Sequence, residues 1–132
     1  MRNSFQNYIV IDDDRTNNLI CNLVISKFDK DAIIELCTEP EKALAYIKKI
    51  YSHDNCFRPT IIFLDINMPK MSGFEFLDEF LKFDAAIREC FNIYMLSSST
   101  EDFQSKSKKY PIVKDFLSKP LTINHLKKIF KE

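Results

Sequence analysis

The chain has 132 residues, of which 45% are hydrophobic, and its 19 basic and 19 acidic side chains give a formal net charge of zero at pH 7. These values suit one soluble domain with a single core, and they exclude a disordered chain and a basic field for nucleic acid or an anionic membrane. No apolar run could span a bilayer and the first residues lack a signal peptide, so we expect a cytoplasmic protein without membrane or nucleic-acid partners.

The first elements are a strand and an amphipathic helix. Tyr8–Ile11 is a short apolar run that stops at Asp12, which predicts a buried strand with carboxylates at its carboxyl end. From residue 15 to residue 28, apolar side chains recur at helical spacing. This pattern predicts a helix whose apolar face consists of Leu19, Ile20, Leu23, Val24 and Phe28.

The next helices begin at recognisable caps. A second strand is expected over Ala32–Cys37, and residues 38–41 resemble a capping box, from Thr38 to Glu41, for a helix to about residue 51. Ser72 and Glu75 predict another capping box, for a helix that ends near Asp84. Between these helices, the run from Thr60 to Asp65 is rich in β-branched and aromatic residues, which is typical of a strand buried on both faces.

The last third repeats the alternation. Strands are expected over 92–96 and 113–117, a weak helix over 100–109, and a final helix capped by Thr122. Strand and helix thus alternate five times, and right-handed crossovers then require a parallel sheet with helices on both faces. We therefore predict a doubly wound (βα)5 α/β sandwich of the flavodoxin-like type.

Polar side chains meet at one edge of this sheet. If the strands are parallel, their carboxyl ends present Asp12, Asp13, Asp65, Ser97 and Lys119. Clustered carboxylates repel one another unless a cation lies among them, and oxygen ligands suit Mg²⁺. A carboxylate beside Mg²⁺ can act as a nucleophile toward a phosphoryl group, so we predict an aspartyl phosphate on Asp65.

These strand ends carry a family resemblance that covers nearly the whole chain. The chain resembles the receiver domains of two-component response regulators, the CheY-like proteins. Any one motif would be weak, but four occur in order, each at a predicted strand end. They are Ile9-Val10-Ile11-Asp12-Asp13, Phe63-Leu64-Asp65-Ile66-Asn67-Met68-Pro69-Lys70-Met71-Ser72-Gly73, Tyr94-Met95-Leu96-Ser97-Ser98 and Phe116-Leu117-Ser118-Lys119-Pro120.

The resemblance implies a metal-dependent phosphoacceptor site. Asp65 would accept the phosphoryl group. Asp13 and Asp65 would ligate Mg²⁺, or Mn²⁺, directly, while Asp12 would act through a water. The backbone carbonyl of Asn67 would be a further ligand.

The resemblance also implies a switch. Ser97 would bond a phosphoryl oxygen and move toward it, and Phe116 would turn inward in response. Lys119 would pair with the phosphoryl group, and its peptide bond to Pro120 would be cis. Two departures from the family, at Ser98 and at residues 109–112, make the shape of the fourth expected helix uncertain.

Partners follow from the same resemblance. We expect a stand-alone receiver over 1–132 without an output domain, which catalyses only its own phosphorylation and dephosphorylation. A histidine kinase or histidine phosphotransfer protein would dock on the first helix around Thr16, Asn17 and Ile20. A downstream protein would bind the face that runs from Thr100 through Phe116 to the last helix.

Other readings remain open at this point. The chain could be a receiver cut from a hybrid histidine kinase, or a binding module that is never phosphorylated. It could also be a Mg²⁺-dependent phosphatase of the haloacid dehalogenase type, although these enzymes carry a second Asp where this chain has Asn67. A nucleotide-binding fold is disfavoured because Gly73 is the only glycine.

Overall fold

A parallel five-stranded sheet forms the centre of the computed structural model, which describes residues 6–51, 59–98 and 104–131. The strand order is β2-β1-β3-β4-β5, which confirms the predicted doubly wound α/β fold. The strands are β1 (Asn7–Ile11), β2 (Ile33–Cys37), β3 (Thr60–Asp65), β4 (Phe91–Ser97) and β5 (Val113–Ser118).

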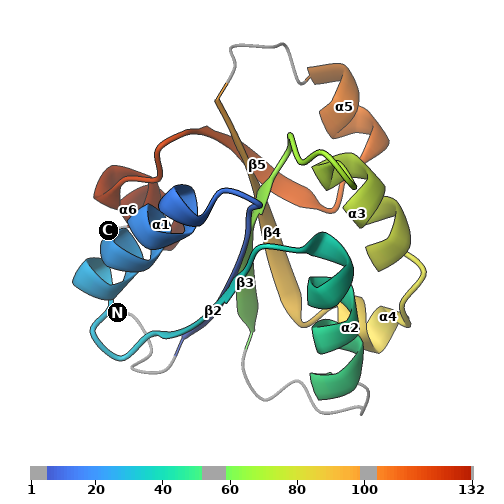
Figure 1. The fold of residues 1–132 in the computed structure, drawn as a ribbon, viewed down its shortest axis with the longest axis horizontal. Coiled ribbons are helices and arrows are strands. Elements are labelled where there is room, and N and C mark those ends of the chain that lie inside the picture. Colours follow the sequence, from blue (N-terminus) through green and yellow to red (C-terminus); the bar gives the residue numbers. More distant parts are fainter. Residues whose placement is uncertain (1–5, 52–58, 99–103, 132) are drawn as a thin grey trace.

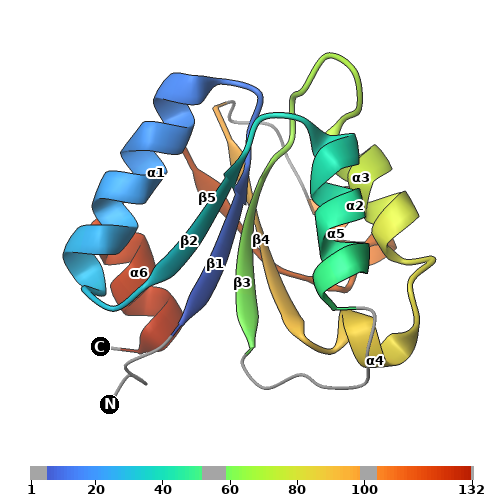
Figure 2. The ribbon, with the colours of Figure 1, turned by 60° about the horizontal axis from the view of Figure 1, so that its bottom comes forward.

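Helices cover both faces of the sheet. α1 and α6 lie on one face, and α2, α3, α4 and α5 lie on the other (Figures 1 and 2). No helix in the described parts of the chain has the length and apolar character needed to cross a bilayer. The helices are α1 (Arg15–Phe28), α2 (Pro40–Ile50), α3 (Gly73–Phe80), α4 (Ala85–Arg88), α5 (Gln104–Lys109) and α6 (Ile123–Phe130).

Alternating side chains of the inner strands build two apolar layers. In β1, Ile9 and Ile11 point toward α2 and α3, whereas Tyr8 and Val10 point toward α1 and α6. All six residues of β3 are buried, as expected for a central strand with helices on both faces. Packing against both layers holds β3 in place, and with it Asp65, the last residue of this strand.

The buried face of α1 differs from the prediction. Leu19 and Leu23 are 58% and 68% exposed, while Asn18, Cys21, Ile25 and Phe28 are the buried residues of this helix. The helix is rotated relative to this expectation, so that the amide of Asn18, which the predicted apolar face did not include, lies against the sheet. The physical reason is that Asn18 finds backbone acceptors there, as described below.

Two further expectations were wrong in detail. No capping box forms over residues 38–41, because Pro40 begins α2 and Glu39 therefore becomes its N-cap, without a side-chain cap bond. Instead Glu39 pairs with Lys42 at 2.9 Å on the surface. The third helix ends at Phe80 rather than near Asp84, because the N–H groups of Lys82 and Phe83 bond only three residues back, to Glu79 and Phe80, which ends the α-helical pattern before Asp84 caps the one-turn helix α4.

Other caps are confirmed. Ser72 and Glu75 form the predicted reciprocal capping box at the start of α3. Thr122 caps α6 with His125 as its partner, since the ring nitrogen Nδ1 of His125 accepts from the Thr122 N–H at 3.0 Å. The predicted start of the fourth long helix at Thr100 lies outside the described residues.

A hydrogen bond joins α3 to the segment between α5 and β5. The buried Tyr110 hydroxyl donates to Asp78 of α3 at 2.9 Å. The ring of Phe74, also on α3, lies 5.3 Å from the Tyr110 ring and 6.5 Å from that of Phe116. Tyr110, which belongs to the stretch 109–112, thus adds contacts between α3 and the segment that leads into β5.

Candidate functional site

Four strands deliver polar side chains to one edge of the sheet. Asp12 directly follows β1, Asp65 is the last residue of β3, and Lys119 directly follows β5. Ser97 ends β4, next to Leu96, which is the register partner of Asp65. The parallel register therefore brings together side chains that lie more than a hundred positions apart in sequence, such as Asp12 and Lys119.

The centre of the site is a cluster of three carboxylates. One oxygen each of Asp12, Asp13 and Asp65 lies within 4.8 Å of the others. Asp12 and Asp65 are buried, and Asp13 is exposed. The ammonium Nζ of Lys119 lies 3.0 Å from Asp12 Oδ2 and 2.9 Å from Asp65 Oδ1, so one cation bridges the two buried anions.

Backbone bonds hold these side chains in place. The Asp14 N–H donates to Asp12 Oδ1 at 2.9 Å, and the Asn67 N–H donates to Asp65 Oδ1 at 3.3 Å. The Lys119 N–H donates to the carbonyl of Ser97 at 2.8 Å, which ties the end of β5 to the end of β4. The Lys119–Pro120 peptide bond is cis.

The cluster lies at the base of an open hollow of about 360 Å³. Ser97 is 3% exposed and lies behind the hollow, whereas its neighbour Ser98 lines it. Phe116 is half-buried on the α3 side of β5, beside Phe74. The hollow is lined by Asp12, Asp13, Asp14, Asn17, Asp65, Asn67, Ser98 and Lys119.

Burial shifts the ionisation of the bridged groups. It raises the pKa of Asp65 to about 6, against the hydrogen bond from Lys119 and with the help of the Asp12 charge. Burial by itself lowers the pKa of Lys119, but the hydrogen bonds to Asp65 and Asp12 outweigh it and the pKa is raised. A carboxyl whose pKa lies this high is poised to gain or lose its proton close to neutral pH.

We expect Asp65 to make the metal-free protein less stable as pH rises. Its folded pKa of about 6 lies above the value of about 3.9 for an unfolded Asp. The neutral form is therefore favoured in the folded state, and the stability it contributes below pH 4 is lost as pH rises through 6. Melting temperatures of wild type and Asp65→Asn, measured from pH 4 to 7.5 without divalent ions, should diverge with pH in favour of the variant. Parallel curves would contradict this assignment.

The donor set fits a hard divalent cation. Carboxylate oxygens are the ligands that Mg²⁺ prefers, usually one or two of them with waters. Asp12 Oδ2 and Asp65 Oδ1 are already oriented toward a positive charge, that of Lys119. The exposed Asp13 opens the cluster to the solvent, so an ion could enter without rearrangement of the sheet.

Sequence reasoning missed Asn18, a buried residue of α1 that contacts the backbone of the site. Its side chain donates to the backbone carbonyl of Asp12 at 2.9 Å. A signal was present, because residues 18, 21, 25 and 28 follow helical spacing and only the first of them is polar. Asp14 is the N-cap of α1, and its side chain accepts from the Thr16 N–H at 2.8 Å.

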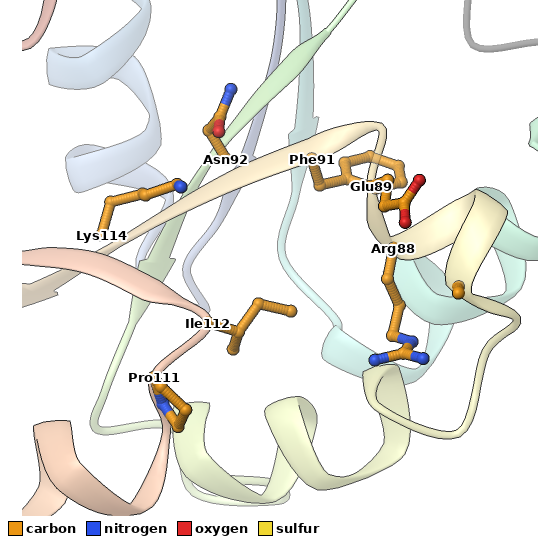
Figure 3. A pocket seen from close by; sticks show the side chains of 8 residues that line it. Arg88, Glu89, Phe91, Asn92, Pro111, Ile112 and Lys114 are labelled. Carbon is orange, nitrogen blue, oxygen red and sulfur yellow. The ribbon is translucent and has the colours of Figure 1, made fainter.

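A larger hollow, of about 500 Å³, lies at the opposite edge of the sheet, where β4 and β5 begin (Figure 3). Arg88 and Lys114 both line it, but their side chains lie on different sides of Ile112 and do not converge (Figure 3). The Nε–H of Arg88 donates a hydrogen bond to the backbone carbonyl of Phe83 at 3.0 Å. Binding sites combine an apolar wall with convergent polar groups, so this hollow lacks the features of the carboxylate site.

Comparisons with known proteins agree on one family. The family model for the response regulator receiver domain matches residues 8–131. A two component response regulator from Cytophaga hutchinsonii is 27% identical, with a TM-score of 0.83 over 96% of this chain and 94% of that one. A two-component response regulator from Legionella pneumophila is 25% identical, with a TM-score of 0.75 over 96% and 95% of the two chains.

A curated relative is a much longer protein. A protein-glutamate methylesterase/protein-glutamine glutaminase from Burkholderia thailandensis is 31% identical over 74 residues. That match covers 56% of this chain and 19% of the relative. The methylesterase activity in its name is therefore a property of that protein.

Proposed function

Because the chain belongs to the response regulator receiver domain family, we propose that it accepts a phosphoryl group on Asp65 and thereby switches a protein-interaction surface. The observation that carries this proposal is the convergence of three carboxylates with the Lys119 ammonium 2.9 Å from Asp65 Oδ1. Receiver domains are signalling domains, and the only reactions we propose for this one are its own phosphorylation and dephosphorylation.

The chemistry begins with a carboxylate oxygen of Asp65 as the nucleophile. It attacks phosphorus in line with the bond to the donor imidazole, and that bond breaks with its electron pair moving to the imidazole nitrogen, which solvent protonates. Lys119, already held against Asp65, would stay paired with the new phosphoryl oxygens. Ser97, at the end of the neighbouring strand, would bond another of them.

A divalent cation belongs to this proposal. Asp13, Asp65 and the backbone carbonyl of Asn67 would hold Mg²⁺ or Mn²⁺, and Asp12 would do so through a water. When bound, the ion neutralises negative charge on the transferring phosphoryl group. The protein's own contribution is to hold the carboxylates close together, which the buried ends of β1 and β3 do.

The proposed output runs through β5. Movement of Ser97 toward the phosphoryl group would leave room for Phe116 to turn inward, and a few kcal/mol of differential interaction suffice for such a switch. The target protein would bind the face formed by α5, β5 and α6. We place the phosphodonor, a histidine kinase or histidine phosphotransfer protein, on α1 around Thr16, Asn17 and Ile20.

The proposal treats the chain as one receiver domain that works in the cytoplasm, with protein partners only. The haloacid dehalogenase alternative has less support. The position two residues beyond Asp65 is Asn67, whose N–H donates to Asp65 Oδ1 at 3.3 Å. An amide at this place cannot serve as the second catalytic carboxylate.

The proposal is tested by incubation with acetyl phosphate and Mg²⁺, followed by intact mass measurement. We expect one phosphoryl adduct on wild type and none on Asp65→Asn, because the amide is not a nucleophile. Asp84→Asn, which changes an exposed carboxylate far from the site, is the matched control and should keep the adduct. An adduct on Asp65→Asn, or none on wild type, would disprove the assignment.

A further inference from the structure

Asn18 occupies a position on α1 that the helix otherwise reserves for apolar side chains. It is 3% exposed and shares the buried stripe with Cys21, Ile25 and Phe28. Burial of an amide is unfavourable unless its hydrogen bonds are replaced. The question is therefore what the side chain does there that an apolar residue could not.

The amide joins the carboxyl ends of two strands. Its Nδ2 donates to the backbone carbonyl of Asp12 at 2.9 Å and to that of Cys37, the last residue of β2, at 3.4 Å. The Asp12 N–H also donates to the Cys37 carbonyl, at 3.0 Å. Both groups that face Nδ2 are acceptors, so the amide cannot be turned by half a rotation.

The amide oxygen of Asn18 makes no corresponding hydrogen bond among the described residues. This Oδ1 atom is also buried. An unsatisfied buried acceptor destabilises the folded state, because the hydrogen bond that it made to water is not replaced. The side chain is thus a poor choice for stability alone, and its value lies in the two donor contacts.

One of those contacts is made to the backbone of Asp12, a residue of the carboxylate cluster. Asp12 is held through its backbone by Asn18, while its side chain accepts from the Asp14 N–H at 2.9 Å and faces Lys119 at 3.0 Å. A shift of the Asp12 peptide would move its carboxylate and also that of Asp13, the next residue. Groups that orient metal ligands in this way typically change metal affinity by about 10–100-fold when they are removed.

We propose that Asn18 is a positioning residue of the divalent-cation site, which fixes the peptide of Asp12 so that Asp12 and Asp13 present their carboxylates to the ion. This inference rests on the function proposed above. In this role Asn18 would not itself ligate the ion or contact the phosphoryl group. It acts through the backbone of Asp12.

The test uses Asn18→Leu, with Asn22→Leu, one turn further along the same helix, as the matched control. Isothermal titration calorimetry with MgCl₂ should show a dissociation constant about tenfold higher for Asn18→Leu and little change for Asn22→Leu. Melting temperatures without Mg²⁺ should be similar for wild type and Asn18→Leu, since the unsatisfied Oδ1 is removed together with the donors. Asn18→Ala, which needs no extra space, serves as the second variant if leucine does not fit.

A kinetic readout separates positioning from general damage. With acetyl phosphate as the donor, the Mg²⁺ concentration for half-maximal phosphorylation should rise, while the rate at saturating Mg²⁺ should change less. Unchanged Mg²⁺ affinity in Asn18→Leu and Asn18→Ala, or loss of folding in both, would overturn the inference. Absence of Mg²⁺ binding by wild type would instead disprove the proposed function from which the inference starts.

Discussion

Replacement of Lys119 by Met should destabilise the metal-free protein by about 3 kcal/mol at pH 7, because removal of one partner leaves buried charge without compensation. The Lys119 side chain is 14% exposed, and it bridges Asp12 and Asp65, which are almost fully buried. Phosphorylation by acetyl phosphate should slow by about a hundredfold, the usual effect of removing a donor from developing negative charge. Urea unfolding and intact mass against time provide the two measurements.

Lys82→Met is a matched control for this prediction. Lys82 Nζ lies 2.9 Å from Glu79 Oε2, the same distance as between Lys119 and Asp65, but the Lys82 side chain is 69% exposed. Exposed ion pairs contribute about 0.2–1 kcal/mol, so this variant should unfold almost as wild type does. Adding Asp65→Asn to Lys119→Met should recover part of the lost stability, since one uncompensated carboxylate is removed. Equal losses in the two lysine variants would contradict the role given to the bridge.

Replacement of Gly73 by Ala should also have a large effect, on stability and site together. A Cβ atom at Gly73 would lie 2.5 Å from the backbone carbonyl oxygen of Asp65, 2.6 Å from Met95 Cε and 3.0 Å from Ile66 Cα. Two of these three atoms belong to the backbone that carries Asp65 and cannot turn aside. We expect a loss of about 3 kcal/mol, at the upper end for overpacking, and slower phosphorylation of the displaced Asp65.

The combination with Met95→Leu distinguishes the two kinds of contact. The shorter branched side chain would relieve the contact with Cε but leave the contacts with Asp65 and Ile66. Only a small recovery of the free energy of unfolding is therefore expected from Gly73→Ala/Met95→Leu. Full recovery would show that side-chain crowding, and not the approach to the strand end, is what excludes a larger residue.

The sheet could be predicted because its three inner strands, β1, β3 and β4, are apolar and largely buried. β3 is a short uninterrupted apolar run, and its length and its β-branched and aromatic residues favour a strand buried on both faces over a buried helix segment. Parallel pairing then places the end of every strand at one edge, so Asp12, Asp65 and Lys119 could be expected to meet before any distance was known. Ser97 was located in the same way, whereas Phe116 was named only from the family resemblance, and the switch assigned to both stays a prediction.

The errors occurred where tertiary contacts override local pattern. On α1 the apolar side chains suggested a face containing Leu19 and Leu23, but the hydrogen bonds of Asn18 favour a different rotation of the helix. Hydrophobicity could not reveal this, because the acceptors belong to the ends of β1 and β2. The early end of α3 has a local cause instead, since the N–H groups of Lys82 and Phe83 bond only three residues back.

The bond between Tyr110 and Asp78 has a mechanical consequence. At its first residue α3 is attached to the strand that carries Asp65, since the Gly73 N–H donates to the Ile66 carbonyl at 2.8 Å. Near its other end it is attached to the start of β5 by the 2.9 Å bond from Tyr110. The helix is thus a strut between the two places, and any displacement of it either carries the start of β5 along or breaks that bond.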